Sequence, residues 1–181
     1  MKLPDITAAA AMLFGVLATA GATSNAGTIA DVPEVLKVQA NEKLSLEAHA
    51  TGVQIYECKA SKDDPLKFEW AFKAPEAELF DSAGKSIGKH YAGPTWESND
   101  GSKVVGELKA KDAGPDPSAI PWPLLSAKST TGDGVFGHTQ SIQRVRTVGG
   151  KAPVDGCNQT LLGKETRVPY KATYFFYVAK P

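Results

Sequence analysis

Residues 88–106 read GKHYAGPTWESNDGSKVVG, and this stretch decides how the chain folds. Two turn signals, Gly93-Pro94 and Asn99-Asp100-Gly101, separate short runs of strand-forming residues. Asp-Gly between alternating apolar and polar residues is a strong signal for a β-hairpin, because glycine adopts the positive φ that a tight turn requires. The stretch therefore predicts short antiparallel strands joined by tight turns.

The same alternation continues on both sides of this stretch. Apolar and polar residues alternate over 43–52, 53–59 and 135–148, and a period of two is typical of half-buried strands. Residues 168–179 carry five aromatic residues, four of them consecutive, which predicts a strand buried on both faces. Since no convincing amphipathic helix is present, the fold expected is all-β, a single antiparallel β-sandwich or barrel-like domain with long Pro/Gly-rich loops.

Further turns and loops follow from local composition. Ser82–Lys85 is expected to be a hairpin turn, and the four prolines of 112–123 predict an irregular crossing. Gly132–Gly137 formally matches G-x-G-x-x-G, but no helix follows it, so a hairpin turn is predicted rather than a dinucleotide site. Three aromatic residues at alternate positions are expected to share the core: Phe68, Trp70 and Phe72.

The N-terminus predicts export. Lys2 precedes an apolar, alanine-rich run over 6–20, and small residues allow cleavage after Ala20 or Ala22. The domain organisation expected is a signal peptide at 1–22, a flexible arm at 23–31 and one β domain at 32–181. The alternative is an uncleaved anchor, although the run is short for a membrane span. No later segment approaches that length, so the mature protein is expected to be periplasmic or secreted.

Two cysteines, Cys58 and Cys157, are the only ones in the chain. An even number of cysteines in an exported protein predicts a disulfide. The alternatives are two buried thiols or half of a metal site. No Cys-x-x-Cys spacing is present, so the disulfide is expected to be structural.

Charge argues against nucleic-acid binding. Twenty basic residues balance twenty acidic ones, whereas nucleic-acid binders carry a basic excess or a basic stripe. Arg144 and Arg146 stand two apart and are expected to share a solvated strand face.

Aromatic and polar side chains concentrate in the opening stretch, which makes it the candidate binding site. A sugar or another small polar molecule needs both stacking surfaces and fixed hydrogen-bonding groups. Trp122 joins the site if the proline loop folds over the hairpin, and the alternative for Trp96 is a core residue under the turn. The candidate residues are His90, Tyr91, Trp96, Glu97, Asp100, Lys103 and Trp122.

The sequence supports an enzymatic function less well than a binding function. His49, His90 and His138 stand singly, and no ligand spacing requires a metal site that includes Asp100 or Glu97. Glu97 and Asp100 resemble the carboxylate pair of a glycoside hydrolase, but any hairpin carries such pairs by chance. No catalytic residue, metal or cofactor is therefore assigned. A metal-dependent or hydrolytic enzyme using His90 and Asp100 stays as one alternative, and a structural envelope or protein-interaction domain stays as another.

An ordered series of motifs resembles a known family. It runs from LEAHATGVQIYEC through AELFD, IGKHYAGPTWESNDGSKVVGE, IPWPLLSAKS and SIQRVRTVGGKAP to YKATYFFY. These motifs resemble the uncharacterised exported family called domain of unknown function 3455, which is bacterial with fungal relatives. The resemblance covers about residues 32–177 and implies a single secreted domain without implying an activity. The function expected is thus a noncatalytic exported β domain that binds a small polar or glycan-like ligand or an envelope component.

Overall fold

The computed structural model describes residues 32–181. The predicted signal peptide and arm, residues 1–31, lie outside the described residues. Within 32–181 no helix is long and apolar enough to cross a membrane.

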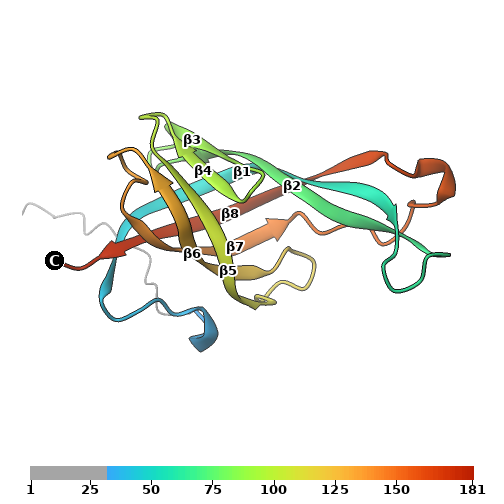
Figure 1. Ribbon diagram of the computed structural model, residues 1–181, viewed down its shortest axis with the longest axis horizontal. Helices are drawn as coiled ribbons and strands as arrows, with labels where there is room; N and C mark the ends of the chain where they lie inside the picture. Colours follow the sequence, from blue (N-terminus) through green and yellow to red (C-terminus); the bar gives the residue numbers. More distant parts are fainter. Residues whose placement is uncertain (1–31) are drawn as a thin grey trace, which may run out of the picture. The chain divides into compact units, whose positions relative to one another are not determined.

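Eight antiparallel strands form one sheet that closes on itself as a barrel (Figure 1). The only helical segments of residues 32–181 are two short 3-10 turns, η2 (Glu34–Leu36) and η3 (Gln159–Leu161). This confirms the all-β prediction, in its barrel form. The strands are β1 (Glu42–Ala60), β2 (Phe68–Phe80), β3 (Ser86–Tyr91), β4 (Thr95–Ser98), β5 (Lys103–Asp112), β6 (Trp122–Thr131), β7 (Thr139–Gly149) and β8 (Glu165–Ala179).

Every strand pairs with its neighbours in the sequence, and β8 also pairs with β1 to close the ring. The connections of such a barrel alternate between its two ends. Residues 61–67, 92–94, 113–121 and 150–164 lie at one end, which we call the open end. Residues 81–85, 99–102 and 132–138 lie at the other, which we call the plugged end.

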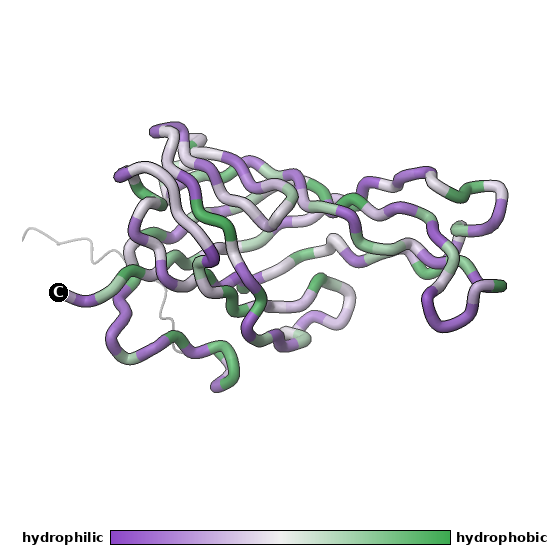
Figure 2. Tube along the Cα trace, viewed as in Figure 1, coloured by the Kyte–Doolittle hydropathy of each residue, from purple (hydrophilic) through white to green (hydrophobic). Residues whose placement is uncertain are grey.

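The predicted strands and turns are present, with longer strands than the sequence suggested. The two alternating runs over 43–59 form one continuous strand, β1, and the Asn99-Asp100-Gly101 turn joins β4 to β5. Gly101 has a φ of 87°, as the turn requires. Polar and apolar residues alternate along the strands, and the turn between β1 and β2 is mainly hydrophilic (Figure 2).

The aromatic residues at the start of β2 do not form core, contrary to the expectation. Phe72 is 57% exposed, and Phe68 and Trp70 are half-buried. The physical reason is the length of β2: pairing with β3 begins only at Ala77, so residues 68–75 pair with β1 alone. These aromatics lie beyond the complete ring, where no opposite wall covers them.

The core fills the inside of the barrel, and β8 contributes to both of its faces. Tyr174 and Phe176 point inward, while Phe175 and Tyr177 pack outside against partly buried residues that include Val38 and Trp122. This confirms that the last strand is buried on both faces. The inner cluster consists of Ala48, Ala50, Ala77, Leu79, Trp96, Val104, Ile120, Leu125, Phe136, Ile142, Tyr170, Ala172, Tyr174 and Phe176.

Phe136 plugs one end of the barrel. It belongs to the turn between β6 and β7, which confirms that Gly132–Gly137 is a strand–turn–strand segment. Its ring is fully buried, with its centroid 4.6 Å from that of Phe176. Two hydrogen bonds hold the turn: Val135 N–H donates to the Asp100 carboxylate at 2.9 Å, and Phe136 N–H donates to Ser102 Oγ at 3.1 Å.

The predicted disulfide is confirmed. Cys58 of β1 is bonded to Cys157 of the connection between β7 and β8, with their Cα atoms 5.4 Å apart. Nearby, Trp70 Nε1 donates to the backbone carbonyl of Asp155 at 3.0 Å. The bond therefore ties the extended part of β1 and β2 to the longest connection at the open end.

Removal of the disulfide is expected to lower the free energy of unfolding by roughly 4 kcal/mol, because the bond closes a long loop in the unfolded chain. The two cysteines are 99 positions apart. Urea denaturation of the oxidised protein and of the Cys58→Ala/Cys157→Ala variant measures the difference. An unchanged urea midpoint would show that the bond does not restrain the unfolded chain.

Substitution of Asp100→Ala is expected to lower the melting temperature by several degrees, because it removes the acceptor that holds the plugging turn. Asp100 also accepts from Ser102 N–H and Ser102 Oγ, at 2.8 and 2.6 Å. These hydrogen bonds, first that of the Ser102 hydroxyl and then that of Val135 N–H, lower the pKa of Asp100 to about 2. The stabilisation is thus complete above the normal pKa of 3.8 and is lost as the pH falls toward 2.

The control is Asp116→Ala. Asp116 caps its own exposed turn through Ser118 in the same way, but within residues 32–181 its side chain makes no hydrogen bond to a second turn. Equal losses of melting temperature in thermal denaturation of the two variants would contradict a special role for Asp100.

Candidate functional site

The hairpin of β3 and β4 divides the predicted site between the two faces of the sheet. His90 and Trp96 are direct partners across the two strands and both are buried, with exposed fractions of 2% and 1%. Their neighbours Tyr91 and Glu97 point the opposite way, since successive side chains of a strand alternate. The predicted cluster is therefore not one site.

The inward pair forms an aromatic stack at the centre of the barrel. The rings of His90 and Trp96 are 4.3 Å apart at their centroids and inclined by only 10°. Tyr174 meets both rings edge-on, at 5.2 and 5.4 Å. Trp96 is thus a core residue, which is the alternative that the sequence had left open.

His90 is a neutral imidazole. Its Nδ1 lies 2.9 Å from the carbonyl oxygen of Thr95, so Nδ1 carries the proton and Nε2 is left as an acceptor. Burial lowers the pKa of His90 to about 3, and the positive charge of Arg144 acts in the same direction.

A cavity of about 360 Å³ lies beside this stack, at the open end of the barrel. Its wall is mainly apolar, and strands β2 to β8 all contribute to it. Phe72 and Leu108 line it and are nevertheless 57% and 56% exposed, so two large apolar side chains stand where the cavity meets solvent. The lining residues are Phe72, Lys73, Pro75, His90, Gly93, Pro94, Trp96, Leu108, Pro123, Leu125, Arg144 and Tyr174.

Few polar groups face this cavity. The indole N–H of Trp96 is buried and has no hydrogen-bond partner among residues 32–181. Lys73 is paired with Glu165 at 2.5 Å and with Glu57 at 3.6 Å. Arg144 donates from Nε and Nη2 to the carbonyl oxygen of Pro121, at 3.3 and 2.8 Å.

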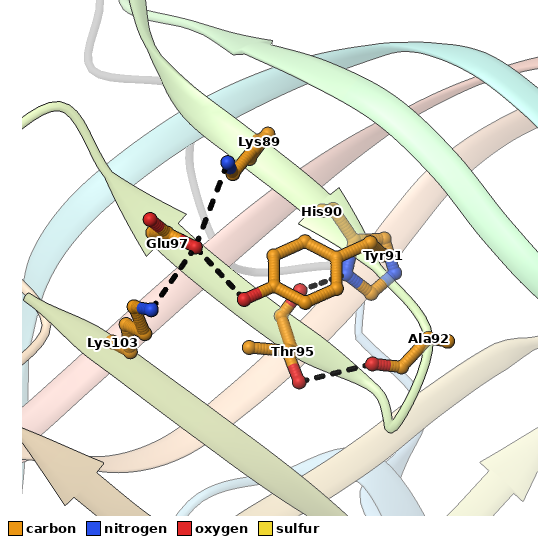
Figure 3. Close-up of polar contacts among 7 residues, drawn as sticks. All are labelled: Lys89, His90, Tyr91, Ala92, Thr95, Glu97 and Lys103. Carbon is orange, nitrogen blue, oxygen red and sulfur yellow. Dashed lines mark hydrogen bonds and ion pairs between the residues drawn. The ribbon is translucent and has the colours of Figure 1, made fainter. Parts of the chain in front are cut away.

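On the outer face, Glu97 is the centre of a network of polar contacts (Figure 3). Its carboxylate accepts from Tyr91 Oη at 2.8 Å and lies 3.4 Å from Lys103 Nζ and 3.7 Å from Lys89 Nζ. The hydrogen bond from Tyr91, followed by that from Lys103, lowers the pKa of Glu97. All three contacts fall on Oε2 of Glu97, so this network is built around one carboxylate oxygen on the outer face of the sheet.

The other two candidate residues lie elsewhere. Asp100 holds the plugging turn, as described above. Trp122 donates from Nε1 to Thr147 Oγ1 at 3.0 Å and packs on the outer face with Val145, Phe175 and Tyr177. The structure therefore brings only His90 and Trp96 together at the cavity.

The histidines are also apart. His49 lies beside Thr173, with its Nδ1 3.4 Å from Oγ1, His90 is inside the barrel, and His138 is exposed next to the β6–β7 turn. Within residues 32–181, no three His, Cys, Asp or Glu side chains are grouped so that they could hold a metal ion.

Arg144 is the site residue that sequence reasoning missed. The expectation of a solvated face shared with Arg146 is wrong, because β7 contains an irregularity between Val145 and Val148 where Arg146 has a φ of 51°. Arg146 lies over the ring of Phe175 on the outer face, whereas Arg144 lines the cavity. A period-two pattern gives no warning of such a bulge.

Comparison with known proteins shows the family of the chain. A family model described as Protein of unknown function (DUF3455) matches residues 38–178, which include all eight strands except the last residue of β8, Ala179. The chain belongs to this family. No curated protein and no solved structure matches the chain. The family resemblance of the sequence is thereby confirmed, and it brings no activity with it.

The stability of the protein is expected to fall as the pH is lowered from 6.5 toward 3, because of His90. The unfolded chain binds a proton at His90 near the normal pKa of 6.5, whereas the folded protein does not until about 3. The contribution of neutral His90 to the free energy of unfolding should thus be fully present above pH 6.5. Below that pH, the free energy of unfolding should decrease by about 1.4 kcal/mol for each pH unit.

Urea denaturation at several pH values tests this expectation with the variant His90→Asn, which keeps a donor for the Thr95 carbonyl and removes the titration. The slope between pH 6.5 and 4 should become shallower in this variant and stay as in the parent protein in His138→Asn. Equal slopes for the parent protein and His90→Asn would refute the assignment.

Proposed function

We propose that this protein is an exported, noncatalytic binding domain that holds a small, mainly apolar molecule in the barrel cavity. The observation that carries the proposal is the apolar cavity of about 360 Å³ with Phe72 and Leu108 exposed where it meets solvent. Pockets of this size and composition are typical of small-molecule sites, and eight-stranded barrels have an interior wide enough for one small ligand. Exposed large apolar side chains that line a cavity favour a ligand that covers them.

The chemistry of the wall favours a ring or hydrocarbon body over a sugar. A glycan carries many hydroxyl groups, and each one buried without a partner costs free energy. The stacking surface of Trp96 is buried against His90 and Tyr174, so it is not the open platform that a surface-bound sugar needs.

The small number of reactive groups near His90 favours a binding role over catalysis. The residues that line the cavity include no Ser, Cys, Asp or Glu, and the ammonium group of Lys73 is engaged by Glu165 and Glu57. Nucleophilic or general acid–base catalysis needs a second reactive group within hydrogen-bonding reach. Asp100, the partner required by the enzyme alternative, is engaged with Ser102 and Val135 at the plugged end.

A protein-interaction role is the second candidate, and the observation in its favour is an unpaired strand edge along residues 68–75 of β2. They pair with β1 alone, so their other edge has no strand beside it in the described part of the chain. Lys73 and Pro75 lie on this edge, and both residue types hinder the addition of a further strand. The cavity is therefore the better supported site.

Export is supported by two features of the chain. The N-terminal sequence has the basic, apolar and small-residue regions of a signal peptide, and the Cys58–Cys157 disulfide suits an oxidising compartment.

Methyl 2-naphthoate, a neutral ring compound with one ester carbonyl, is a suitable probe of the cavity. Equilibrium dialysis with the protein isolated from its own export compartment should show one bound probe per chain. Leu108→Trp adds bulk where the cavity meets solvent and should weaken binding at least about tenfold. The intact mass of the same preparation reports whether the leader has been removed.

Leu162→Trp is the matched control, because Leu162 is also exposed but lies in the β7–β8 connection and does not line the cavity. It should leave the affinity unchanged. Failure of the probe to bind, or equal binding by the parent protein and Leu108→Trp, would overturn the proposal.

A further inference from the structure

Arg144 brings a positive charge to the wall of an otherwise apolar cavity. Its Cα partner across β7 and β8 is Tyr174, which lines the same cavity. The side chain is half-buried, and its charge is close enough to influence the pKa values of His90, Tyr56 and Tyr170. The guanidinium therefore lies where its charge reaches the interior of the barrel.

No acidic residue compensates this charge. The other two arginines of the chain are in ion pairs, Arg146 with Glu47 at 3.3 Å and Arg167 with Glu76 at 2.7 Å. For Arg144, no carboxylate of residues 32–181 lies within ion-pairing distance. A half-buried charge without a counter-charge is costly unless something else supplies one.

The neighbouring ionisable groups cannot supply a negative charge either. Burial raises the pKa values of Tyr56 and Tyr170, so both phenols stay protonated at neutral pH, and His90 is neutral. The remaining cation in the wall, Lys73, is already paired with Glu165 and Glu57. One positive charge thus remains without a counter-charge in the wall of the cavity.

The guanidinium is held in place with donors to spare. Nε and Nη2 both donate to the carbonyl oxygen of Pro121, which fixes the orientation of the group. Nη1 and the second N–H of Nη2 are on the other edge of the planar group, and a pair of parallel N–H donors matches the two oxygens of a carboxylate. The irregular proline-rich loop between β5 and β6 thus provides the acceptor that orients the arginine.

We propose that the ligand is a small organic acid with one carboxylate, which pairs with Arg144 while a ring or hydrocarbon body fills the apolar cavity. The inference rests on the proposed binding function of the cavity and specifies its ligand class. A single uncompensated guanidinium matches a single negative charge, and the cavity volume limits the body to one of a few small rings.

The test compares two probes of nearly equal shape, 2-naphthoate and methyl 2-naphthoate, by equilibrium dialysis at pH 7. The parent protein should bind the acid at least about tenfold more tightly than the ester, because a charge-assisted hydrogen bond is stronger than a neutral one. Arg144→Gln should remove this preference by weakening 2-naphthoate binding roughly 10- to 100-fold, with the ester little affected.

Arg167→Gln is the matched control, because it removes the same charge from a surface ion pair with Glu76, and neither residue lines the cavity. It should leave both affinities unchanged. Arg144→Lys keeps the charge without the fork of donors and should retain part of the preference, which provides a second test if Arg144→Gln does not fold. Circular dichroism and thermal denaturation monitor folding of each variant.

The outcomes separate this inference from the proposed function. Equal binding of both probes by the parent protein would overturn the carboxylate assignment and leave the cavity as a binding site. A preference for the acid that persists in Arg144→Gln would also overturn it. Binding of neither probe would overturn the proposed function itself.

Discussion

The pairing of β8 with both β1 and β7 is the constraint on which the rest of the structure depends. It closes the sheet into a ring and so gives every strand an inner and an outer face. β8 contributes aromatic side chains to both faces: Tyr174 and Phe176 pack inside the barrel, and Phe175 and Tyr177 pack in the outer cluster. Without the closure, the stack of His90 and Trp96 would lie on an open sheet surface rather than in a barrel.

The ring is filled unequally along its length, and this produces the cavity. At the plugged end, Phe136 enters the core, held by Asp100 and Ser102. Near the middle, the large indole of Trp96 fits because Gly106 faces it: a Cβ at Gly106 would lie 3.0 Å from the indole and 2.9 Å from Leu125. Beyond the stack of His90 and Trp96, no side chain of residues 32–181 fills the cavity as Phe136 fills the other end. An arginine oriented by a backbone carbonyl lies there instead.

Local sequence rules predicted the fold well, because each rule acts over a few residues. Alternation located β1 and β7, the Asn99-Asp100-Gly101 turn located the β4–β5 hairpin, and the cysteine count gave the disulfide. The site was harder to predict. Residues 88–98 carry aromatic and polar side chains on both faces, so alternation alone does not tell which face, His90 with Trp96 or Tyr91 with Glu97, lies inside. Only the closure of the ring, which involves strands more than a hundred residues apart, decides this. Arg144 was missed for the same reason, since it keeps the period of the inward-facing Ile142 and alternation does not tell which face lies inside; the bulge in β7 then moves Arg146 to the other face.

A crystal structure of the protein grown with 2-naphthoate tests the central claim most directly. The account predicts the naphthalene ring in the cavity against the side chains of Leu108 and Trp96, with the carboxylate paired to the guanidinium of Arg144. Two results would contradict it: a cavity filled by the protein's own side chains with the probe on the outer face, or a probe inside the barrel with its carboxylate turned away from Arg144.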